Sequence, residues 1–382
     1  MHQKTECETA NQIMSLQKAA GYWKNLNGLR GFLCLVVFAA HFARGFSYSG
    51  SLEFLNALSE RGTHAPEIFF VISGFLLMNS FRSTGIGLTT AQYYGRRAFR
   101  IFPLLWIAVL FENFFYSHAA DVELFKNLFL LNGIFPYREG DLYPFVAWSL
   151  AVEETYYLAM PLIGRYSSLL IAAVAVILLQ VVGSIYWYEL KALVPTGYEW
   201  HQPVFTFFNL FIGILIYHVY TDGYLASAMK SRYFSQVFDV LAVVILCIWT
   251  AEHNILDPLL GGCLLAGALL NKSLFSSLLW KQRLLQYAGT RCFSIYLIHP
   301  MVLSIAGFNE HAGRVLSFIR ELPFAGIENL ICLALVLSAV LLISELAYRV
   351  IEKPLTELGK TIFISPAAAV LHPHSPPIRI SP

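Results

Sequence analysis

An arginine and a histidine share one face of the first long apolar stretch of the chain. Arg30 and His41 are separated by ten residues, so on a helix they lie about three turns apart and project in the same direction. His41 would lie roughly 16 Å deeper than Arg30, about halfway through a hydrocarbon core of ~30 Å. Ionisable groups at that depth are costly and usually face a cavity or a partner. A neutral imidazole there is suited to take a proton from an attacking hydroxyl group, whereas a purely structural histidine would bond to a backbone carbonyl.

A cluster of basic residues leads into the third apolar stretch. Arg97 and Arg100 are three positions apart, so they share a helix face and can form a fork for phosphate groups. Arg96 is better explained by the excess of positive charge on the cytoplasmic side of membrane proteins. Together with Arg30, the pair would make a site of three guanidinium groups at the cytoplasmic mouth of a cavity. Such a site suits a polyanionic ligand from the cytoplasm.

Two adjacent carboxylates, Glu153 and Glu154, lie within the fourth apolar stretch, where charge is expensive in lipid. Adjacent residues on a helix point about 100° apart, so one carboxylate can face a cavity while the other faces a neighbouring helix. They can form a structural ion pair with Arg30 or Arg138, or they can orient and charge His41. The sequence leaves open which carboxylate faces the cavity.

Small and polar residues occur within two further apolar stretches. Ser73 and Gly74 lie in the middle of one stretch, where small residues commonly permit close helix packing, with a cavity wall as the second interpretation. His299 precedes Pro300, which kinks a helix and frees a backbone carbonyl, so His299 is either a second cavity residue or a local hydrogen-bond donor. The candidates for the substrate cavity are Ser73, Trp148, Tyr156 and His299.

The composition indicates a membrane protein. Of the 382 residues, 57% are hydrophobic and only 13% are charged, with a formal net charge of +2. Soluble domains usually carry about twice that charge fraction. Apolar segments recur from near residue 29 to residue 347, which favours a polytopic helical membrane protein over a soluble domain with one anchor. The 6 cysteines show no CxxC or Cys/His ligand spacing, so we expect neither a disulfide framework nor a metal site.

The predicted fold class is all-α, with about ten transmembrane helices. A shorter apolar segment, 123–136, is more typical of a re-entrant or interfacial piece. Lysine and arginine concentrate in the loops that a cytoplasmic N-terminus would place inside, so we expect both termini in the cytoplasm (N-in, C-in) and an even number of spans. The predicted spans lie at about 29–46, 65–82, 99–117, 147–163, 167–187, 203–220, 236–252, 255–271, 284–306 and 326–347.

These motifs, taken in order, resemble the acyltransferase-3 family of membrane acyltransferases, typified by bacterial O-antigen and exopolysaccharide O-acetyltransferases. The motifs are Leu26–Gly31 with His41, Phe69–Leu77, Arg97–Arg100 followed by Pro103–Trp106, Trp148–Tyr157, Ser294–Pro300 and Tyr348–Pro354. The chain departs from the family's pattern at Asn27, Thr155 and Ile298, where the family usually has Asp, Gln and Trp. These changes affect the expected acceptor specificity more than the chemistry.

The chain divides into three parts. The resemblance covers residues 24–358, which would form the membrane acyltransferase domain. Residues 1–23 would be a cytoplasmic N-terminal segment, in which the helical spacing of Ile13, Leu16 and Ala20 allows an amphipathic helix over 8–23. Residues 359–382 are rich in proline and would be a disordered cytoplasmic tail. The first 27 residues lack the pattern of a cleaved signal peptide, so we expect the first span to be retained. The chain ends soon after its last span, so we expect no fused extracytoplasmic hydrolase-like domain of the kind that some members carry.

The resemblance also implies an activity. The Arg-x10-His pair and the Arg-x-x-Arg pair would be functionally required. An acyl-coenzyme A, with acetyl-CoA as the expected form, would be the donor on the cytoplasmic side. A hydroxyl of an extracytoplasmic or lipid-linked glycan would accept the acyl group. The expected location is the bacterial inner (plasma) membrane, with membrane lipid as a partner and no nucleic acid.

The sequence therefore leads to one mechanistic hypothesis. Arg30, Arg97 and Arg100 hold the phosphates of acetyl-CoA. His41 acts as the general base, with Glu153 or Glu154 supporting its imidazolium. A transient acyl-His that relays the acyl group across the membrane is a variant of the same hypothesis.

The competing class is a proton-coupled transporter, or a flippase of a glycan or lipid intermediate. In such a protein His41, His299 and the acidic pair would form a proton relay. Ten spans and a midplane histidine fit that class equally well, whereas the Arg-x-x-Arg pair and the ordered motifs favour the enzyme. A non-catalytic scaffold does not explain why charge is concentrated in the first, third and fourth spans.

Overall fold

The structure is a computed structural model, and it describes most of the chain. The described residues are 2–44, 62, 64–84, 89–117, 121–135, 137–138, 142–192, 198–199, 203–221, 231–248, 256–270, 272–306 and 327–363. The tail predicted to be disordered lies almost wholly outside them.

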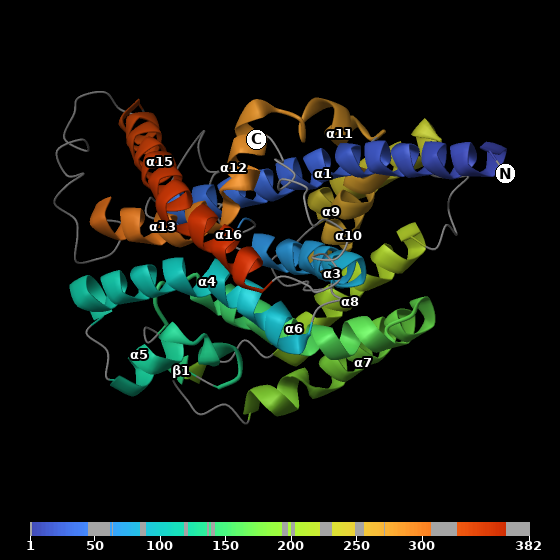
Figure 1. The fold of residues 1–382 in the computed structure, drawn as a ribbon. Helices are drawn as coiled ribbons and strands as arrows, with labels where there is room; N and C mark the ends of the chain where they lie inside the picture. The colour runs from blue at the N-terminus through green and yellow to red at the C-terminus, as the bar shows by residue number, and fades with distance from the viewer. Residues whose placement is uncertain are drawn as a thin grey trace.

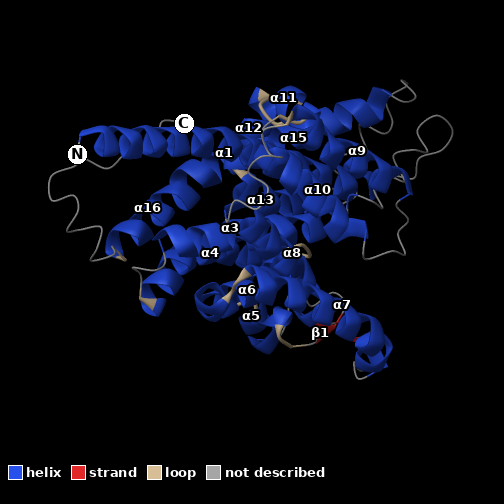
Figure 2. Cartoon of the chain, turned by 90° about the vertical axis from the view of Figure 1, so that its right-hand side faces the viewer, coloured by secondary structure: helices blue, strands red, loops and turns tan. Residues whose placement is uncertain are grey.

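Helices make up nearly all of the described structure (Figures 1 and 2). They are α1 (His2–Arg44), α3 (Ala65–Thr84), α4 (Thr90–Glu112), α5 (Asp121–Leu128), α6 (Ala147–Tyr166), α7 (Leu169–Ala192), α8 (Pro203–Thr221), α9 (Arg232–Ile248), α10 (Leu256–Leu270), α11 (Leu274–Leu278), α12 (Arg283–Thr290), α13 (Cys292–Ala306), α15 (Ile327–Ala347) and α16 (Lys353–Ile362). Short π-helical segments extend α4 over Asn113–Ser117 and join α15 to α16 over Tyr348–Glu352. Strands β1 (Tyr137–Arg138) and β2 (Tyr198–Glu199) pair antiparallel.

The start of α4, the helix that carries the arginine pair, is set by local sequence. The Thr89 side chain accepts a hydrogen bond from the Gln92 backbone N–H at 3.2 Å, and the Gln92 side chain accepts one from the Thr89 N–H at 2.9 Å. This reciprocal cap satisfies two donors that a helix N-terminus otherwise leaves unpaired. It therefore fixes the start of α4 at Thr90, six residues before Arg96.

Glycines let two pairs of helices approach closely. A Cβ atom at Gly74 of α3 would lie 2.1 Å from the Leu210 carbonyl oxygen of α8, and one at Gly213 would lie 2.0 Å from the Val71 carbonyl oxygen. The same happens between α1 and α12, where a Cβ atom at Gly31 would lie 2.0 Å from the Leu285 carbonyl oxygen. The packing interpretation of Gly74 is therefore confirmed, because no side chain larger than hydrogen fits between these backbones.

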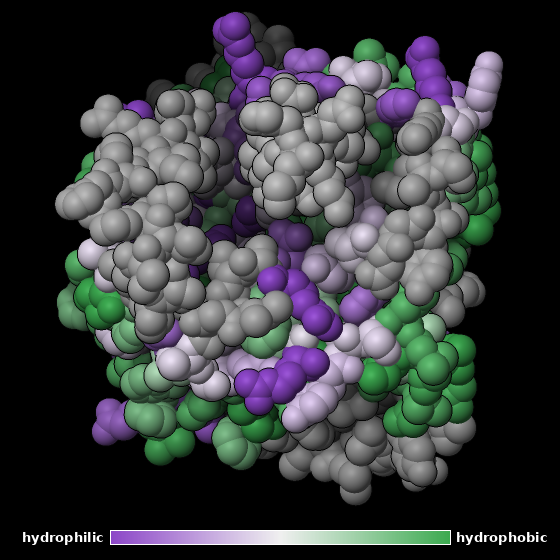
Figure 3. Space-filling view, turned by 45° about the vertical axis from the view of Figure 1, so that its right-hand side comes forward, coloured by the Kyte–Doolittle hydropathy of each residue, from purple (hydrophilic) through white to green (hydrophobic). Residues whose placement is uncertain are grey.

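The polar and apolar surfaces are arranged as a membrane protein requires. Large hydrophobic side chains such as Leu170 of α7, Val240 of α9 and Leu342 of α15 are exposed on the outside. On the face shown in Figure 3, hydrophilic residues lie inside and below a central hollow, and hydrophobic residues lie along the right-hand edge. Exposed apolar side chains on this scale fit a helix bundle that contacts lipid.

The apolar helices indicate an integral membrane protein. Within the described residues, Trp23–Arg44, Thr90–Phe115 and Ile331–Ile362 are long and apolar enough to cross a membrane. Four further apolar helices, Leu169–Val182, Thr206–Thr221, Leu256–Leu270 and Cys292–Ala306, are shorter. The number of about ten spans and the N-in, C-in orientation therefore remain predictions.

Most predicted segments match helices, and the differences have physical causes. The predicted span 284–306 is divided at Arg291 into α12 and α13. Arg291 forms an ion pair with Glu345 of α15, and its guanidinium lies over the Tyr287 and Tyr348 rings, 4.1 Å and 4.9 Å from their centres. If α12 and α13 formed one continuous helix, the Arg291 side chain would point in a different direction and would lose these contacts.

Two other segments refine the prediction. The apolar piece 123–136 contains α5 and a 3-10 turn over Leu131–Gly133, both too short to span a membrane. The helix predicted over 8–23 is the first part of α1, which continues without a break to Arg44. The all-helical prediction is confirmed, apart from the two-residue strands.

Candidate active site

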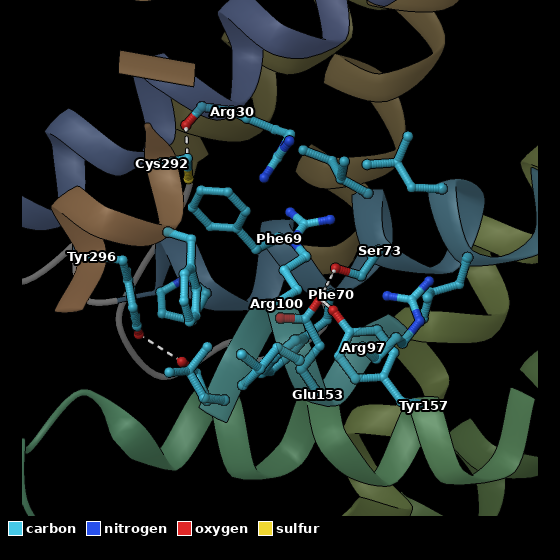
Figure 4. Close-up of a pocket in the computed structure, with 18 of the residues that line it drawn as sticks. Arg30, Phe69, Phe70, Ser73, Arg97, Arg100, Glu153, Tyr157, Cys292 and Tyr296 are labelled. Atoms are coloured by element: carbon cyan, nitrogen blue, oxygen red, sulfur yellow. Dashed lines mark hydrogen bonds between the residues drawn. The ribbon is translucent and has the colours of Figure 1, made fainter. Parts of the chain in front are cut away.

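Five helices enclose a cavity of 290 Å³ near the centre of the bundle (Figure 4). Helices α1, α3, α4, α6 and α13 each contribute side chains to its wall, so segments from the whole length of the chain meet there. The charged and hydrogen-bonding residues in the wall are Arg30, Ser73, Ser80, Arg97, Arg100, Ser149, Glu153, Tyr157, Cys292 and Tyr296.

The structure brings together the three arginines that the sequence singled out. Arg30 reaches the cavity from α1, and Arg97 and Arg100 reach it from α4 (Figure 4). Glu153 is the one carboxylate among the lining residues, so the charged side chains in the wall are three guanidinium groups and one carboxylate. An anionic ligand is therefore favoured over a cationic one, because the wall carries an excess of positive charge.

Two aromatic rings hold Arg97 in place. Its guanidinium carbon lies 4.1 Å from the centre of the Tyr157 ring of α6 and 5.1 Å from the centre of the Tyr93 ring of α4. Both distances are within the range of cation–π attraction. Among the described residues, Arg97 Nε is buried and has no hydrogen-bond partner. The rings therefore orient the guanidinium without neutralising it, which leaves its charge for a ligand.

Glu153 is the carboxylate that faces the cavity. Its Oε1 atom accepts hydrogen bonds from Ser73 Oγ and from the Tyr157 hydroxyl, both at 2.8 Å (Figure 4). Glu154 is not part of the wall, and its Oε2 atom is buried without a hydrogen-bond partner in the described part of the chain. This resolves the choice that the sequence left open, since consecutive residues of α6 point in different directions. Ser73 belongs to the cavity wall, beside the packing glycine.

His41 lies outside the cavity wall and contacts a second histidine. His41 Nδ1 and His299 Nε2 are 3.0 Å apart, and the two rings stack at an interplanar angle of 14°. The Phe145 ring meets His41 edge to face, with 4.8 Å between ring centres. In the described structure the hydrogen-bond partner of His41 is thus His299, whereas Glu153 bonds to Ser73 and Tyr157.

His299 is both a partner of His41 and a local hydrogen-bond donor. Its Nδ1 atom donates to the Ile295 carbonyl oxygen at 3.1 Å, one turn earlier on α13. The side chain is 1% exposed. Of the two interpretations that the sequence left open for His299, the structure supports the local hydrogen bond, because His299 does not line the cavity wall.

Tyr296 separates the histidine pair from the cavity. It lines the cavity wall, and its ring centre lies 5.8 Å from that of His299. Its hydroxyl forms hydrogen bonds with Ser149 Oγ at 2.5 Å and with the Val146 carbonyl oxygen at 3.2 Å. Sequence reasoning quoted Ser149 and Tyr296 within motifs but assigned them no role. The spacing of Tyr296 three positions before His299 was the available signal, since such residues share a helix face.

Three of the four candidate cavity residues do not line the wall: His299, described above, Trp148 and Tyr156. The Trp148 ring packs against Phe70, with 6.1 Å between ring centres, and does not line the cavity. The Tyr156 hydroxyl donates to the Thr206 carbonyl oxygen of α8 at 2.7 Å, and the side chain is fully buried. The geometry therefore assigns Tyr156 to the packing between α6 and α8 rather than to the cavity.

The part of the chain that the structure describes contains no preformed metal site. No group of three histidine, cysteine, aspartate or glutamate side chains is arranged to hold a metal ion there. The charged groups around the cavity are instead those that bind phosphate and transfer protons.

Comparison with known proteins supports the resemblance. Residues 23–349 match the profile of a family described as "Acyltransferase domain". A Bacillus subtilis protein provisionally named peptidoglycan O-acetyltransferase YrhL is 25% identical over 386 aligned positions, which cover 88% of this chain and 55% of that protein. Peptidoglycan O-acetyltransferase OatA of Listeria monocytogenes is 22% identical and is covered to 56%, with 88% of this chain aligned.

A further relative is shorter. A protein of Acidianus two-tailed virus provisionally named acetyltransferase ORF330 is 30% identical over 148 positions, which cover 37% of this chain and 41% of that protein. No solved structure matches the chain. The chain spans about half the length of the two bacterial relatives. Since the family profile covers most of its residues, the chain belongs to the acyltransferase-3 family of membrane acyltransferases.

Proposed function

We propose that this protein is a membrane O-acetyltransferase that moves an acetyl group from acetyl-CoA to a hydroxyl of a cell-wall or lipid-linked glycan. The observation that carries this proposal is the cavity in which Arg30, Arg97 and Arg100 meet. Two relatives named as peptidoglycan O-acetyltransferases support a carbohydrate acceptor. Peptidoglycan or its lipid-linked precursor is therefore the first acceptor to test.

The arginines form the donor half of the site. Guanidinium groups bind phosphate oxygens through paired hydrogen bonds, and coenzyme A carries phosphates in its nucleotide half. Arg97 is held by Tyr93 and Tyr157, so little side-chain freedom is lost when a phosphate binds. Glu153 keeps Ser73 and Tyr157 in place at the same wall and so shapes the donor site rather than the base.

His41 forms the acceptor half. The acceptor hydroxyl gives its proton to the imidazole of His41 while its oxygen attacks the thioester carbonyl carbon. The carbon–sulfur bond then breaks, and the coenzyme A thiolate takes the proton back from His41. The products are an O-acetyl ester and free coenzyme A, and the imidazole returns to its neutral form.

The two halves are joined along α1 and α13. Arg30 and His41 lie on α1, and the wall between the cavity and His41 contains Tyr296 of α13. The thioester end of the donor must pass the Ser149–Tyr296 hydrogen bond to reach the imidazole. With the N-terminus in the cytoplasm, the arginines face the cytoplasmic donor and His41 lies deeper, toward an extracytoplasmic acceptor. The proposed location is the bacterial plasma membrane.

One observation favours the competing transporter hypothesis, and it can be tested directly. Two histidines in contact at 3.0 Å could pass a proton. A transporter or flippase, however, would release no thiol from acetyl-CoA.

The test is a transfer assay with the purified protein in lipid nanodiscs. We expect the protein to release free thiol from labelled acetyl-CoA and to place the label on a glycan fragment, identified by mass spectrometry. His41→Ala should abolish transfer while the protein stays inserted and still binds the donor. Label retained on the protein itself would identify the acyl-His variant of the mechanism. A folded His41→Ala protein that transfers acetyl normally would overturn the proposal.

A further inference from the structure

Three groups form a directed chain of hydrogen bonds at the end of α1. The Ile295 carbonyl oxygen, the two ring nitrogens of His299 and Nδ1 of His41 follow one another at 3.1 Å and 3.0 Å. His299 is 1% exposed, and its ring is flanked by Phe38 edge to face, with 6.4 Å between ring centres. The His299 end of the chain is therefore shielded from water, whereas His41 is partly buried.

The carbonyl decides the direction of the chain. A backbone carbonyl can only accept, so His299 Nδ1 must carry the hydrogen that points to Ile295. A neutral imidazole carries one hydrogen, so His299 Nε2 is then a bare acceptor. His41 must supply the hydrogen between the rings, from its Nδ1 atom. The opposite direction would need a doubly protonated His299, which is a cation buried among apolar side chains.

This direction leaves Nε2 of His41 as the basic nitrogen. We propose that His299 is a positioning residue that holds His41 in the Nδ1–H tautomer and so presents Nε2 to the acceptor hydroxyl, an inference that rests on the proposed function. A carboxylate performs the same task for the histidine of serine proteases. Here the partner is a neutral histidine, which suits an apolar interior because no permanent charge is buried.

The hydrogen bond between His41 and His299 also changes during transfer. When Nε2 takes the proton of the acceptor hydroxyl, His41 becomes an imidazolium whose Nδ1–H still donates to His299 Nε2. The hydrogen bond becomes charge-assisted and therefore stronger at the moment when charge develops. No proton has to leave His41 toward His299, and the proton on Nε2 passes to the departing thiolate.

A matched pair of substitutions separates the two bonds of His299. In His299→Asn, the short amide can keep the bond to the Ile295 carbonyl but cannot reach His41. In His299→Gln, the longer side chain places a carbonyl oxygen near the position of Nε2, where it can accept from His41 Nδ1–H. We expect His299→Asn to lower kcat by about 100-fold, in line with the loss of an oriented general base. We expect His299→Gln to stay within about tenfold of the unaltered protein.

The affinity for acetyl-CoA provides the control. Neither variant alters the arginine cavity, so the dissociation constant of labelled acetyl-CoA should be unchanged in both. If His299→Asn is not recovered in folded form, His299→Leu, which has similar apolar bulk and no acceptor, should show the same 100-fold loss. If the role of His299 were purely structural, kcat would fall in both variants, and glutamine would not restore it.

The outcomes separate the inference from the proposed function. If the unaltered protein transfers no acetyl group, or His41→Ala transfers normally, the proposed function fails. If those two behave as expected but His299→Asn keeps full kcat, His299 has no positioning role. If folded His299→Gln is as inactive as His299→Asn, the acceptor at Nε2 is not what matters, and the inference is overturned.

Discussion

Replacing Arg97 by glutamine removes the positive charge that the structure holds most firmly in the cavity wall. Its guanidinium lies between the Tyr157 and Tyr93 rings, 4.1 Å and 5.1 Å from their centres. Glutamine is planar and polar, but it carries no charge and cannot form the paired hydrogen bonds that guanidinium makes with phosphate. The substitution therefore removes the ligand-binding group and leaves a shorter, uncharged polar side chain.

The magnitude follows from the kind of bond that is lost. A hydrogen bond to a charged group contributes about 1.5–3 kcal/mol. Each 1.4 kcal/mol corresponds to about a tenfold change in affinity, so the dissociation constant for acetyl-CoA should rise by about 10- to 100-fold. Arg97→Lys keeps the charge but loses the planar fork and its stacking on two rings, worth about 0.5–1 kcal/mol each. It should therefore fall between glutamine and arginine.

The assay is equilibrium binding of labelled acetyl-CoA to the protein in nanodiscs. Arg96→Gln is the matched control, because Arg96 lies next to Arg97 on α4 but does not line the cavity. Its Nε atom donates to the Phe363 carbonyl oxygen at 2.9 Å. The control should bind the donor with unchanged affinity. If folded Arg97→Gln also binds it like the unaltered protein, the arginine cavity is not the donor site.

Two further predictions concern packing. Gly74→Ala places a Cβ atom 2.1 Å from the Leu210 carbonyl oxygen and should destabilise the protein by about 1–3 kcal/mol, whereas at Gly262 the nearest atom to an added Cβ is 3.6 Å away. The melting temperature of the detergent-solubilised protein should therefore fall for Gly74→Ala but not for Gly262→Ala. Equal melting temperatures in the two variants would contradict the α3–α8 contact. Tyr156→Phe removes the 2.7 Å hydrogen bond to the Thr206 carbonyl, so it should cost about 0.5–1.5 kcal/mol of stability while the donor affinity stays unchanged. A lower donor affinity in a stable Tyr156→Phe protein would return Tyr156 to the cavity.

Much of the fold could be read from hydrophobic periodicity. Long apolar runs correspond to helices, but the ends were less predictable: the span predicted from about 99 begins at Thr90 in the structure, where the Thr89–Gln92 cap sets the start. The break at Arg291 was missed because its cause is non-local. The partner that holds Arg291 is Glu345, on another helix.

The same contrast between local signals and non-local contacts applies to the candidate site. Relations along one helix were predictable, because α-helical geometry alone places Arg97 and Arg100 on one face. Relations between helices were not. Either Glu153 or Glu154 was expected to support His41, but in the structure Glu153 bonds to Ser73 and Tyr157 and lines the cavity with the arginines. Trp148 and Tyr156 share a motif with Glu153 and still point away from the cavity.

The sequence by itself determined that this chain forms apolar helices with a few ionisable groups inside them, because the helical period and the expense of charge in lipid act on each segment separately. It also determined the family, through the order of short motifs. Only the tertiary structure decided which groups meet. His41 and His299 are 258 positions apart, and their contact exists because α1 and α13 pack side by side. The sequence pattern of each helix shows which residues share a face, but it does not show which face of α1 packs against which face of α13.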